Sequence, residues 1–237
     1  MTPDTGLAYP SQSTEDYVDS LDASSNKELV SDVQVNYRPL PVWKRACDVM
    51  GACVAFVVLL PLFAFIALTI KLSSQGPIFF RQTRFGGAGE LFDIWKFRTM
   101  EAGADAQKHK VHVASIAAAG ERVSKIDNSE HLLPLAKLWR AVGADELPQL
   151  INVLLGEMSL VGPRPDVLSL EDYQPWQLRR FEVTPGITGY WQVKGKNRTT
   201  FDEMIQMDID YAEQRSMWFD FKILLMTLPA VIRLAVD

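Results

Sequence analysis

An uncharged stretch in the first third of the chain dominates its hydropathy pattern. Val49–Ile70 contains 22 residues without a charged side chain, preceded by Lys44 and Arg45 and followed by Lys71. As a helix rising about 1.5 Å per residue, it would be roughly 33 Å long, enough to cross the hydrocarbon core of a bilayer. Pro61, near its middle, has no amide hydrogen to donate, so it predicts a bend at mid-membrane depth.

The cations on both sides of this stretch indicate how it is oriented. Lysine and arginine favour the cytoplasmic side of a membrane, and here they stand before and after the apolar residues. A helix that enters the bilayer, bends at Pro61 and leaves on the same face accommodates both features. A kinked transmembrane helix remains an alternative, since prolines occur in true spans. A buried helix of a soluble core is disfavoured because the stretch has no polar face. We therefore expect a re-entrant membrane anchor over residues 37–73.

After the apolar stretch, the pattern of hydrophobic residues becomes typical of β-strands. Two aromatic segments, Pro77–Phe85 and Leu91–Arg98, flank the glycine-rich Gly86–Glu90 and predict a β-hairpin. A solvated edge hairpin is one interpretation of its cations, and an electropositive floor for phosphate groups is the other. The cations are Arg81, Arg84, Lys96 and Arg98.

A pair of adjacent acids follows the next helical pattern. Gly143 predicts the end of that helix, and Asp145 and Glu146 would open the following one, where Pro148 suits the first turn. The positive end of the helix dipole favours the ionised forms of both acids. Ionised carboxylates are hard ligands for Mg²⁺, and an ionised aspartate can attack phosphorus. Ordinary helix capping is the alternative.

Three later segments add to this picture. Gly162–Pro165 is a rigid loop that fixes Arg164, whose guanidinium suits phosphate oxygens. Trp218–Arg233 is apolar but interrupted by charges, which predicts an amphipathic helix at a membrane interface or a packed core helix. Pro185–Val193 combines a turn with a short aromatic strand and could form the wall of a nucleotide site. The residues of that predicted wall are Pro185, Gly186, Thr188, Gly189 and Gln192.

Composition sets the remaining limits. The hydrophobic fraction of 48% is ample for a core, and the net charge is −5. Seven acids and one base lie in residues 1–36, which predicts an acidic disordered tail rather than a signal peptide. The two cysteines suggest no disulfide framework. The pI is near 5.3, so we do not expect the protein to bind nucleic acid. We expect an α+β fold, mainly helical, with a small aromatic sheet and a cytosolic domain over 74–237.

The order of these motifs resembles that of the bacterial sugar transferases, the monotopic phosphoglycosyl transferases that act on polyprenyl phosphate. The resemblance runs from about Lys44 to Ile232. It rests on Lys44-Arg45-x-x-Asp48, Gly76-Pro77-x-Phe79-Phe80-Arg81-Gln82-x-Arg84, Lys96-Phe97-Arg98-Thr99-Met100, Asp145-Glu146-Leu147-Pro148-Gln149, Met158-Ser159-Leu160-Val161-Gly162-Pro163-Arg164-Pro165, Pro185-Gly186-Ile187-Thr188-Gly189 and Asp220-x-Lys222-Ile223-Leu224. The chain departs from the family pattern at Thr184, where the family often has a basic residue, at Gly143-Ala144 and at Leu60.

The resemblance implies an activity. A hexose-1-phosphate would pass from a UDP-sugar to undecaprenyl phosphate, the first membrane step in assembling a glycan of the exopolysaccharide or O-antigen type. Asp145 would attack the β-phosphorus and carry a covalent phosphosugar, Asp145 and Glu146 would hold Mg²⁺, and Arg140 and Arg164 would clamp phosphate. The enzyme would sit on the cytosolic face of the bacterial inner membrane.

Several alternatives stay open at this stage. A membrane-tethered, non-catalytic interaction protein would use the acidic pair only as a cap. A homo-oligomer is compatible with the sequence, and neither the transferred sugar nor the polyprenol length can be read from it.

Overall fold

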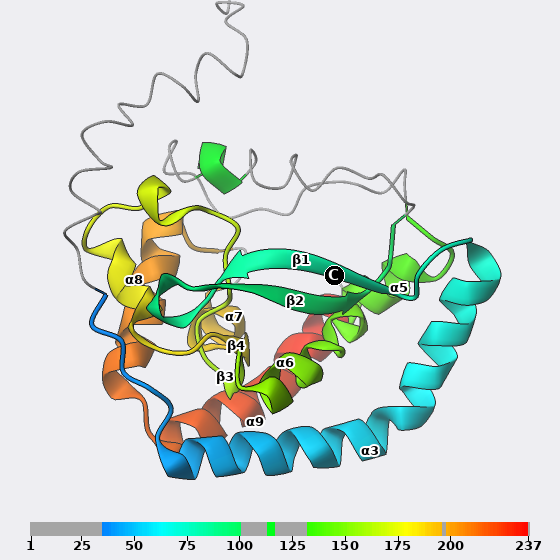
Figure 1. The fold of residues 1–237 in the computed structure, drawn as a ribbon, viewed down its shortest axis with the longest axis horizontal. Coiled ribbons are helices and arrows are strands. Elements are labelled where there is room, and N and C mark those ends of the chain that lie inside the picture. Colours follow the sequence, from blue (N-terminus) through cyan, green and yellow to red (C-terminus); the bar gives the residue numbers. More distant parts are fainter. Residues whose placement is uncertain (1–34, 101–112, 117–131, 196–197, 237) are drawn as a thin grey trace, which may run out of the picture.

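The computed structural model describes residues 35–100, 113–116, 132–195 and 198–236. Helices predominate in this part of the chain, and the strands form two sheets of two strands each, as the expected mainly helical α+β class requires. Figure 1 shows the elements wrapped around a central hairpin. They are α3 (Val42–Ser73), β1 (Phe79–Phe85), η1 (Gly87–Gly89), β2 (Leu91–Phe97), α5 (Ala136–Ala141), η3 (Ala144–Glu146), α6 (Gln149–Leu155), β3 (Ser159–Val161), η4 (Leu170–Asp172), η5 (Gln177–Glu182), β4 (Gly186–Thr188), α7 (Tyr190–Lys194), α8 (Phe201–Gln214) and α9 (Met217–Val236).

The predicted apolar anchor is one long helix. α3 has 32 residues, with Pro61 inside it, and its ribbon runs along the lower edge of the molecule before turning upward (Figure 1). In the described part of the chain it is the one helix long and apolar enough to cross a membrane, and 17% of its apolar window is buried. These properties are compatible with association with a membrane.

The N-terminal cations of α3 bind the rest of the protein. Lys44 is 2% exposed and donates to Asp220 of α9 at 2.5 Å. Arg45 donates to the main-chain oxygens of Val153 and Leu154, where α6 ends and its unpaired carbonyls carry partial negative charge. Both side chains therefore hold the helix against the body of the protein, a role that the sequence interpretation did not assign to them.

The predicted hairpin is confirmed. β1 and β2 pair antiparallel from Phe79 opposite Phe97 to Phe85 opposite Leu91, and η1 closes the turn. Aromatic rings continue from the hairpin onto α3, because Phe97 lies 5.4 Å from Phe63 between ring centroids. One core cluster accordingly joins the hairpin, α3 and α6.

A second sheet forms where two glycines allow backbones to touch. β3 and β4 pair in parallel, with Ser159 opposite Gly186 and Val161 opposite Thr188. A Cβ on Gly162 would lie 2.5 Å from the Thr184 carbonyl oxygen, and one on Gly186 would collide with the main chain of Gly162. Only glycine therefore fits at Gly162 and Gly186. The close contact of the two main chains supports the loop that carries Arg164.

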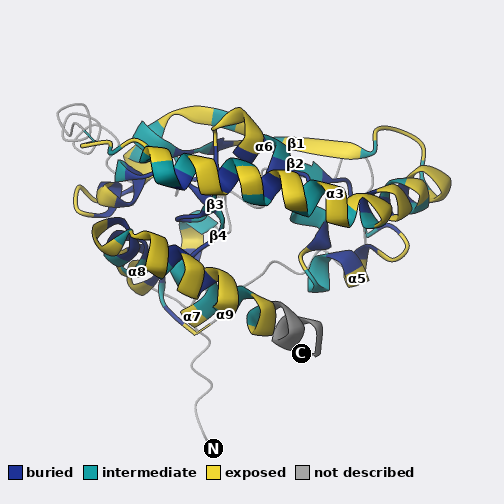
Figure 2. Cartoon of the chain, turned by 90° about the horizontal axis from the view of Figure 1, so that it is seen from below, coloured by how far each residue is buried: buried dark blue, intermediate teal, exposed yellow. Residues whose placement is uncertain are grey.

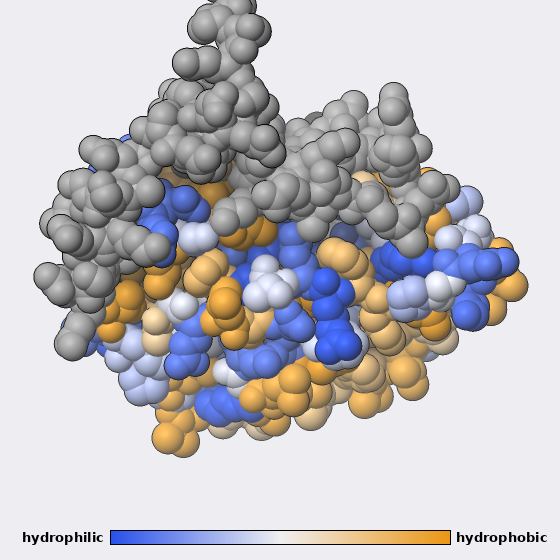
Figure 3. Space-filling model, turned by 45° about the horizontal axis from the view of Figure 1, so that its top comes forward, coloured by the Kyte–Doolittle hydropathy of each residue, from blue (hydrophilic) through white to orange (hydrophobic). Residues whose placement is uncertain are grey.

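α3 and α9 expose apolar side chains on the same side of the molecule. Figure 2, viewed from below, shows exposed residues along both helices, and Figure 3 shows apolar groups along the lower border beneath a more polar middle. The large exposed ones on α9 are Met217, Trp218, Phe221, Leu224, Leu225 and Leu228. This arrangement agrees with an amphipathic α9.

The chain joins the body before α3 begins. Val35 packs against the cluster around α8, and Tyr37 shares a hydrogen bond of 2.9 Å with Thr184. The predicted acidic tail over 1–36 otherwise lies outside the described residues. Thr184 is thus buried and engaged with the segment that leads into α3.

Candidate active site

The two acids lie on a short turn between helices. Gly143 has φ +70°, a left-handed conformation suited to glycine, and ends the preceding helix as predicted. Asp145 and Glu146 then form the 3₁₀ turn η3, whereas Pro148 is the N-cap of α6. The sequence had suggested that the acids occupy the first turn of α6. In the structure they precede this helix.

Glu146 is held by two cations. Arg164 donates to both of its carboxylate oxygens, at 3.0 and 2.5 Å, and Lys96 of β2 donates to Oε1 at 3.0 Å. Burial raises the pKa of Glu146, but the charges of Arg164 and Lys96 outweigh burial and hold this pKa well below its ordinary value. Glu146 is therefore ionised and fixed in position.

Asp145 differs sharply from its neighbour. In the described part of the chain no group donates a hydrogen bond to its carboxylate, which is half-buried. Burial, reinforced by the charge of Glu146, raises the pKa of Asp145 to about 6. The expectation that the helix dipole would favour ionisation of both acids is therefore wrong for Asp145, because desolvation and a like charge dominate there. A pKa of about 6 still leaves roughly 90% of the group ionised at pH 7.

Further cations surround the two acids. The charges of Lys96, Arg140 and Arg164 all lower the pKa of Asp145. Burial, reinforced by the charge of Arg164, lowers the pKa of Arg84 to about 10. Four of the six predicted phosphate-binding cations thus gather around the acids: Arg84, Lys96, Arg140 and Arg164.

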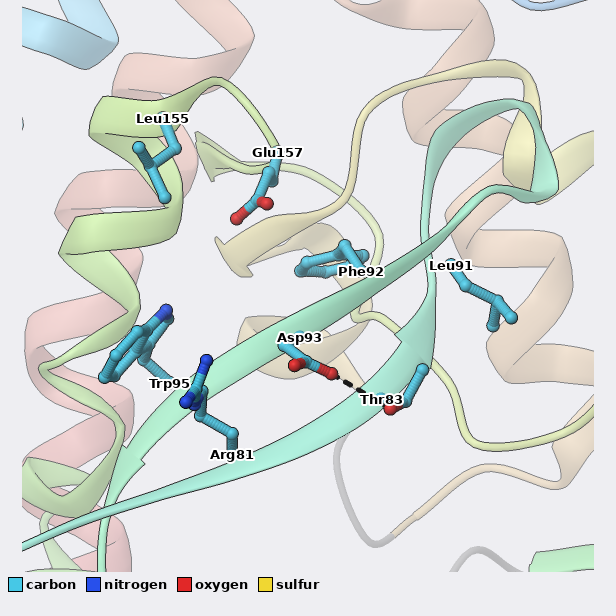
Figure 4. Close-up of a pocket in the computed structure, with 8 residues that line it drawn as sticks. All are labelled: Arg81, Thr83, Leu91, Phe92, Asp93, Trp95, Leu155 and Glu157. Atoms are coloured by element: carbon cyan, nitrogen blue, oxygen red, sulfur yellow. Dashed lines mark hydrogen bonds between the residues drawn. The ribbon is translucent and has the colours of Figure 1, made fainter.

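The other two predicted cations lie elsewhere. Arg81 stacks over the ring of Trp95 at 4.8 Å, on the face of the hairpin opposite to Lys96, where an open hollow of about 440 Å³ is found (Figure 4). Arg98 donates to the main-chain oxygens of Ser74 and Gln75 and so fixes the end of α3. Strand alternation, which puts residues an odd number apart on opposite faces, would have separated Arg81 from Arg84.

Asn152 was not recognised from the sequence. Its side chain is fully buried, accepts from the amide of Trp95 and donates to the carbonyl of Asp93 and to Glu157. These bonds attach α6 to the free edge of β2, which places Lys96 beside the acids. A polar residue inside the apolar run of α6 was the signal available in the sequence.

The predicted nucleotide wall occupies a packed position, and its aromatic part forms the helix α7 instead of the predicted strand. Pro185, Gly186 and Gly189 are buried, and Gly186 pairs with Ser159 in the second sheet. Thr188 bonds to Thr227 of α9, and Gln192 donates to the carbonyl of Ile187. These contacts connect the segment to the sheet and to α9, and its contact with a nucleotide remains a prediction.

The donor set of the two acids fits a magnesium ion. In the described residues no group of three or more histidine, cysteine or acidic side chains is placed to hold a metal. Mg²⁺, however, is commonly bound by one or two carboxylates together with substrate phosphates and water. Asp145 accepts no hydrogen bond from the residues that the structure describes, and Oε2 of Glu146 accepts one hydrogen bond and retains a lone pair. Hard oxygen donors are thus available.

Comparisons with known proteins identify the family. A sequence model described as bacterial sugar transferase matches residues 40–234. The "UDP-glucose:undecaprenyl-phosphate glucose-1-phosphate transferase" of Caulobacter vibrioides is 39% identical over 198 residues, which cover 80% of this chain and 69% of that protein. "Exopolysaccharide production protein ExoY" of Rhizobium meliloti is 36% identical over 191 residues, 79% of this chain and 84% of that protein.

A third relative is considerably longer than the match. "Galactosyl transferase CpsE" of Streptococcus agalactiae is 37% identical over 191 residues, which cover 80% of this chain but 42% of that protein. The residues matched by the family model, 40–234, contain the acids, their cations and the second sheet. The chain therefore belongs to the bacterial sugar transferase family.

Proposed function

We propose that this enzyme transfers a sugar-1-phosphate from a UDP-sugar to undecaprenyl phosphate or a related polyprenyl phosphate, with Asp145 as the nucleophile. The names of the relatives from Caulobacter vibrioides and Rhizobium meliloti support sugar-phosphate transfer in exopolysaccharide assembly. The contrast between the two acids supports the choice of nucleophile.

That contrast is the observation that carries the proposal. A nucleophile must be ionised, accessible and free of strong hydrogen bonds, and Asp145 meets these conditions. Glu146 has its oxygens engaged by Arg164 and Lys96. Glu146 therefore orients the cations that face the diphosphate, while Asp145 reacts.

The reaction proceeds in two displacements. A carboxylate oxygen of Asp145 forms a bond to the β-phosphorus, and the bond from that phosphorus to the bridging oxygen breaks, releasing UMP. A phosphate oxygen of the polyprenyl phosphate then attacks the same phosphorus, and the bond from phosphorus to the Asp145 oxygen in this acyl phosphate breaks. The carboxylate is regenerated, and the product is a polyprenyl diphosphate sugar.

Cations lower the barrier to this attack. The carboxylate and the diphosphate are both anionic, so their approach requires neutralisation. Arg140 makes no side-chain hydrogen bond to the described residues and is free to bind phosphate oxygens. Asp145 and Glu146 would hold Mg²⁺, which when bound supplies further positive charge to the diphosphate.

The test is release of UMP by membranes that contain the enzyme. Wild-type protein is incubated with undecaprenyl phosphate and a panel of UDP-sugars, and Asp145→Asn is compared with Asp93→Asn, a matched change at an exposed carboxylate on β2. We expect UMP with at least one sugar, none from Asp145→Asn, and a normal rate from Asp93→Asn. Undiminished UMP release by Asp145→Asn would contradict the proposal, and the absence of any turnover by the wild type would favour an interaction protein.

We further propose that α3 is a re-entrant anchor in the inner leaflet, bent at Pro61, with the catalytic part on the cytosolic face. The two ends of α3 bind the same body of the protein, through Lys44 with Asp220 at one end and through Arg98 with Ser74 at the other. A helix that spanned the bilayer would place these ends on opposite sides. α9 would add an interfacial contact through its exposed apolar side chains.

Accessibility labelling tests this topology. Single cysteines are introduced at Met1 and Asp237 in a Cys47→Ser/Cys53→Ser background, in sealed vesicles of known orientation. We expect a membrane-impermeant thiol reagent to label both or neither, according to the orientation of the vesicles. Labelling of one end alone would establish a span.

A further inference from the structure

A fully buried arginine lies behind the Arg164 loop. Arg180 of η5 is 2% exposed, and its guanidinium donates to Asp166 and to the hydroxyl of Tyr173 through Nη1, at 2.8 and 2.9 Å. Nη2 donates to Asp208 of α8 at 2.8 Å. A charge with three side-chain partners at this depth is held in a single orientation.

The same guanidinium reaches the main chain of the phosphate-binding arginine. Nη2 of Arg180 also donates to the carbonyl oxygen of Arg164 at 2.8 Å. The flanking prolines, Pro163 and Pro165, restrict the backbone on either side. This carbonyl therefore has a fixed position relative to α8 and η5.

The neighbouring aspartate extends the connection to the hairpin. Asp166 accepts from Arg180 through Oδ2, and its main-chain oxygen accepts from the amide of Phe85 at 3.0 Å. Phe85 ends β1, the strand that carries Arg84. One buried arginine thus links the loop of Arg164 to the hairpin and to α8.

We propose that Arg180 is a positioning residue for sugar-phosphate transfer, which holds Arg164 where its side chain reaches both oxygens of Glu146. Arg180 itself donates no hydrogen bond to Asp145 or Glu146. Arg180 acts through the backbone of Arg164, and the Arg164 side chain in turn orients Glu146. The expected effect on rate rests on the proposed function. The position of the Arg164 side chain, however, can be measured without turnover.

The test replaces Arg180 with lysine. A single ammonium nitrogen cannot reach Asp166, Asp208 and the Arg164 carbonyl as the two guanidinium nitrogens do. Since a small misplacement of a catalytic group costs up to about 100-fold in rate, we expect Arg180→Lys to lower kcat/KM roughly 10- to 100-fold. The matched control is Arg179→Lys at the adjacent exposed arginine, which bonds to Glu182 and Glu213 and should leave the rate unchanged.

A double-mutant cycle separates positioning from a general structural effect. If Arg180 acts through Arg164, then adding Arg180→Lys to Arg164→Lys should lower kcat/KM by less than about 3-fold further. The same factor in both backgrounds would show that Arg180 acts independently of Arg164, and the proposal would be wrong.

Nitrogen-15 NMR of labelled arginines gives a readout that needs no activity. A guanidinium held by two bonds cannot rotate freely, so the Nη signals of Arg164, assigned with Arg164→Lys, should be separate in the wild type and averaged in Arg180→Lys. Unchanged Arg164 signals would overturn the proposal. A wild type that releases no UMP would refute the proposed function instead, while the NMR result still decides the role of Arg180.

A milder variant covers the case in which Arg180→Lys does not fold. Asp208→Asn keeps the shape of the side chain and an oxygen acceptor but weakens its bond to Nη2 of Arg180. We expect averaged Arg164 signals and kcat/KM lowered about 3- to 10-fold, because a charged hydrogen bond is replaced by a neutral one. Separate Arg164 signals in this variant would contradict the proposal.

Discussion

The chemical demands on Asp145 should make it a source of instability. Its carboxylate accepts no hydrogen bond from the described residues, and burial beside Glu146 raises its pKa to about 6. An asparagine of the same shape would lose no hydrogen bond and would remove a charge from an unfavourable environment. We therefore expect Asp145→Asn to be inactive yet more stable than the wild type.

The size of this effect follows from the pKa. The ordinary value is 3.8, so a folded value of about 6 corresponds to an upper limit of about 3 kcal/mol above pH 7. Since Asp145 is partly exposed, we expect about 1–3 kcal/mol, or an increase in Tm of roughly 2–10 °C for a protein of this size.

The pH dependence has a definite sign. Because the folded pKa lies above the unfolded one, folding takes up a proton between these values, so ionisation of Asp145 destabilises the fold progressively as the pH rises towards 6 and fully above it. The advantage of Asp145→Asn should therefore be largest at pH 8 and about half as large at pH 5.

Thermal unfolding in nanodiscs measures this advantage. The wild type, Asp145→Asn and the control Asp93→Asn are compared at pH 8 and pH 5, with the same lipid and heating rate because unfolding of membrane proteins is often irreversible. A Tm for Asp145→Asn equal to or below that of the wild type at pH 8 would refute the reasoning.

Three further predictions concern the supports of the site. Glu146→Gln removes the like charge, so the pKa of Asp145 should fall below 6 in a carbon-13 NMR titration; an unchanged value would show that burial acts alone. Asn152→Ala leaves buried main-chain groups of β2 unpaired and should destabilise by about 2 kcal/mol in thermal melts, whereas an unaltered Tm would show that water replaces the amide. Lys44→Met leaves Asp220 without its cation and should cost about 3 kcal/mol or more, which a combined Lys44→Met/Asp220→Leu variant should largely restore.

Local patterns allowed part of the fold to be predicted from the sequence. The two aromatic runs around Gly86–Glu90 predicted the hairpin because strand period and turn chemistry are local properties. Gly143 marked the end of a helix for the same reason. The acids were recognised as candidate site residues because two adjacent carboxylates follow a helix-ending glycine, and Arg164 because prolines flank it.

Contacts between distant segments explain what the sequence did not show. Lys44 looks the same in sequence whether it faces lipid headgroups or Asp220, which is 176 residues away. The parallel pairing of Gly186 with Ser159 and the bonds of Arg180 likewise depend on tertiary packing. The raised pKa of Asp145 arises from burial, which outweighs the helix dipole and has no local signature.

The account depends most directly on a covalent bond between Asp145 and the donor's phosphosugar. Purified enzyme is given the UDP-sugar that supports turnover, without polyprenyl phosphate, then quenched in acid and digested for mass spectrometry. The account predicts a hexose phosphate on the peptide that contains Asp145, lost when polyprenyl phosphate is added before quenching. Release of stoichiometric UMP with that peptide unmodified, or with the adduct on another residue, would contradict it.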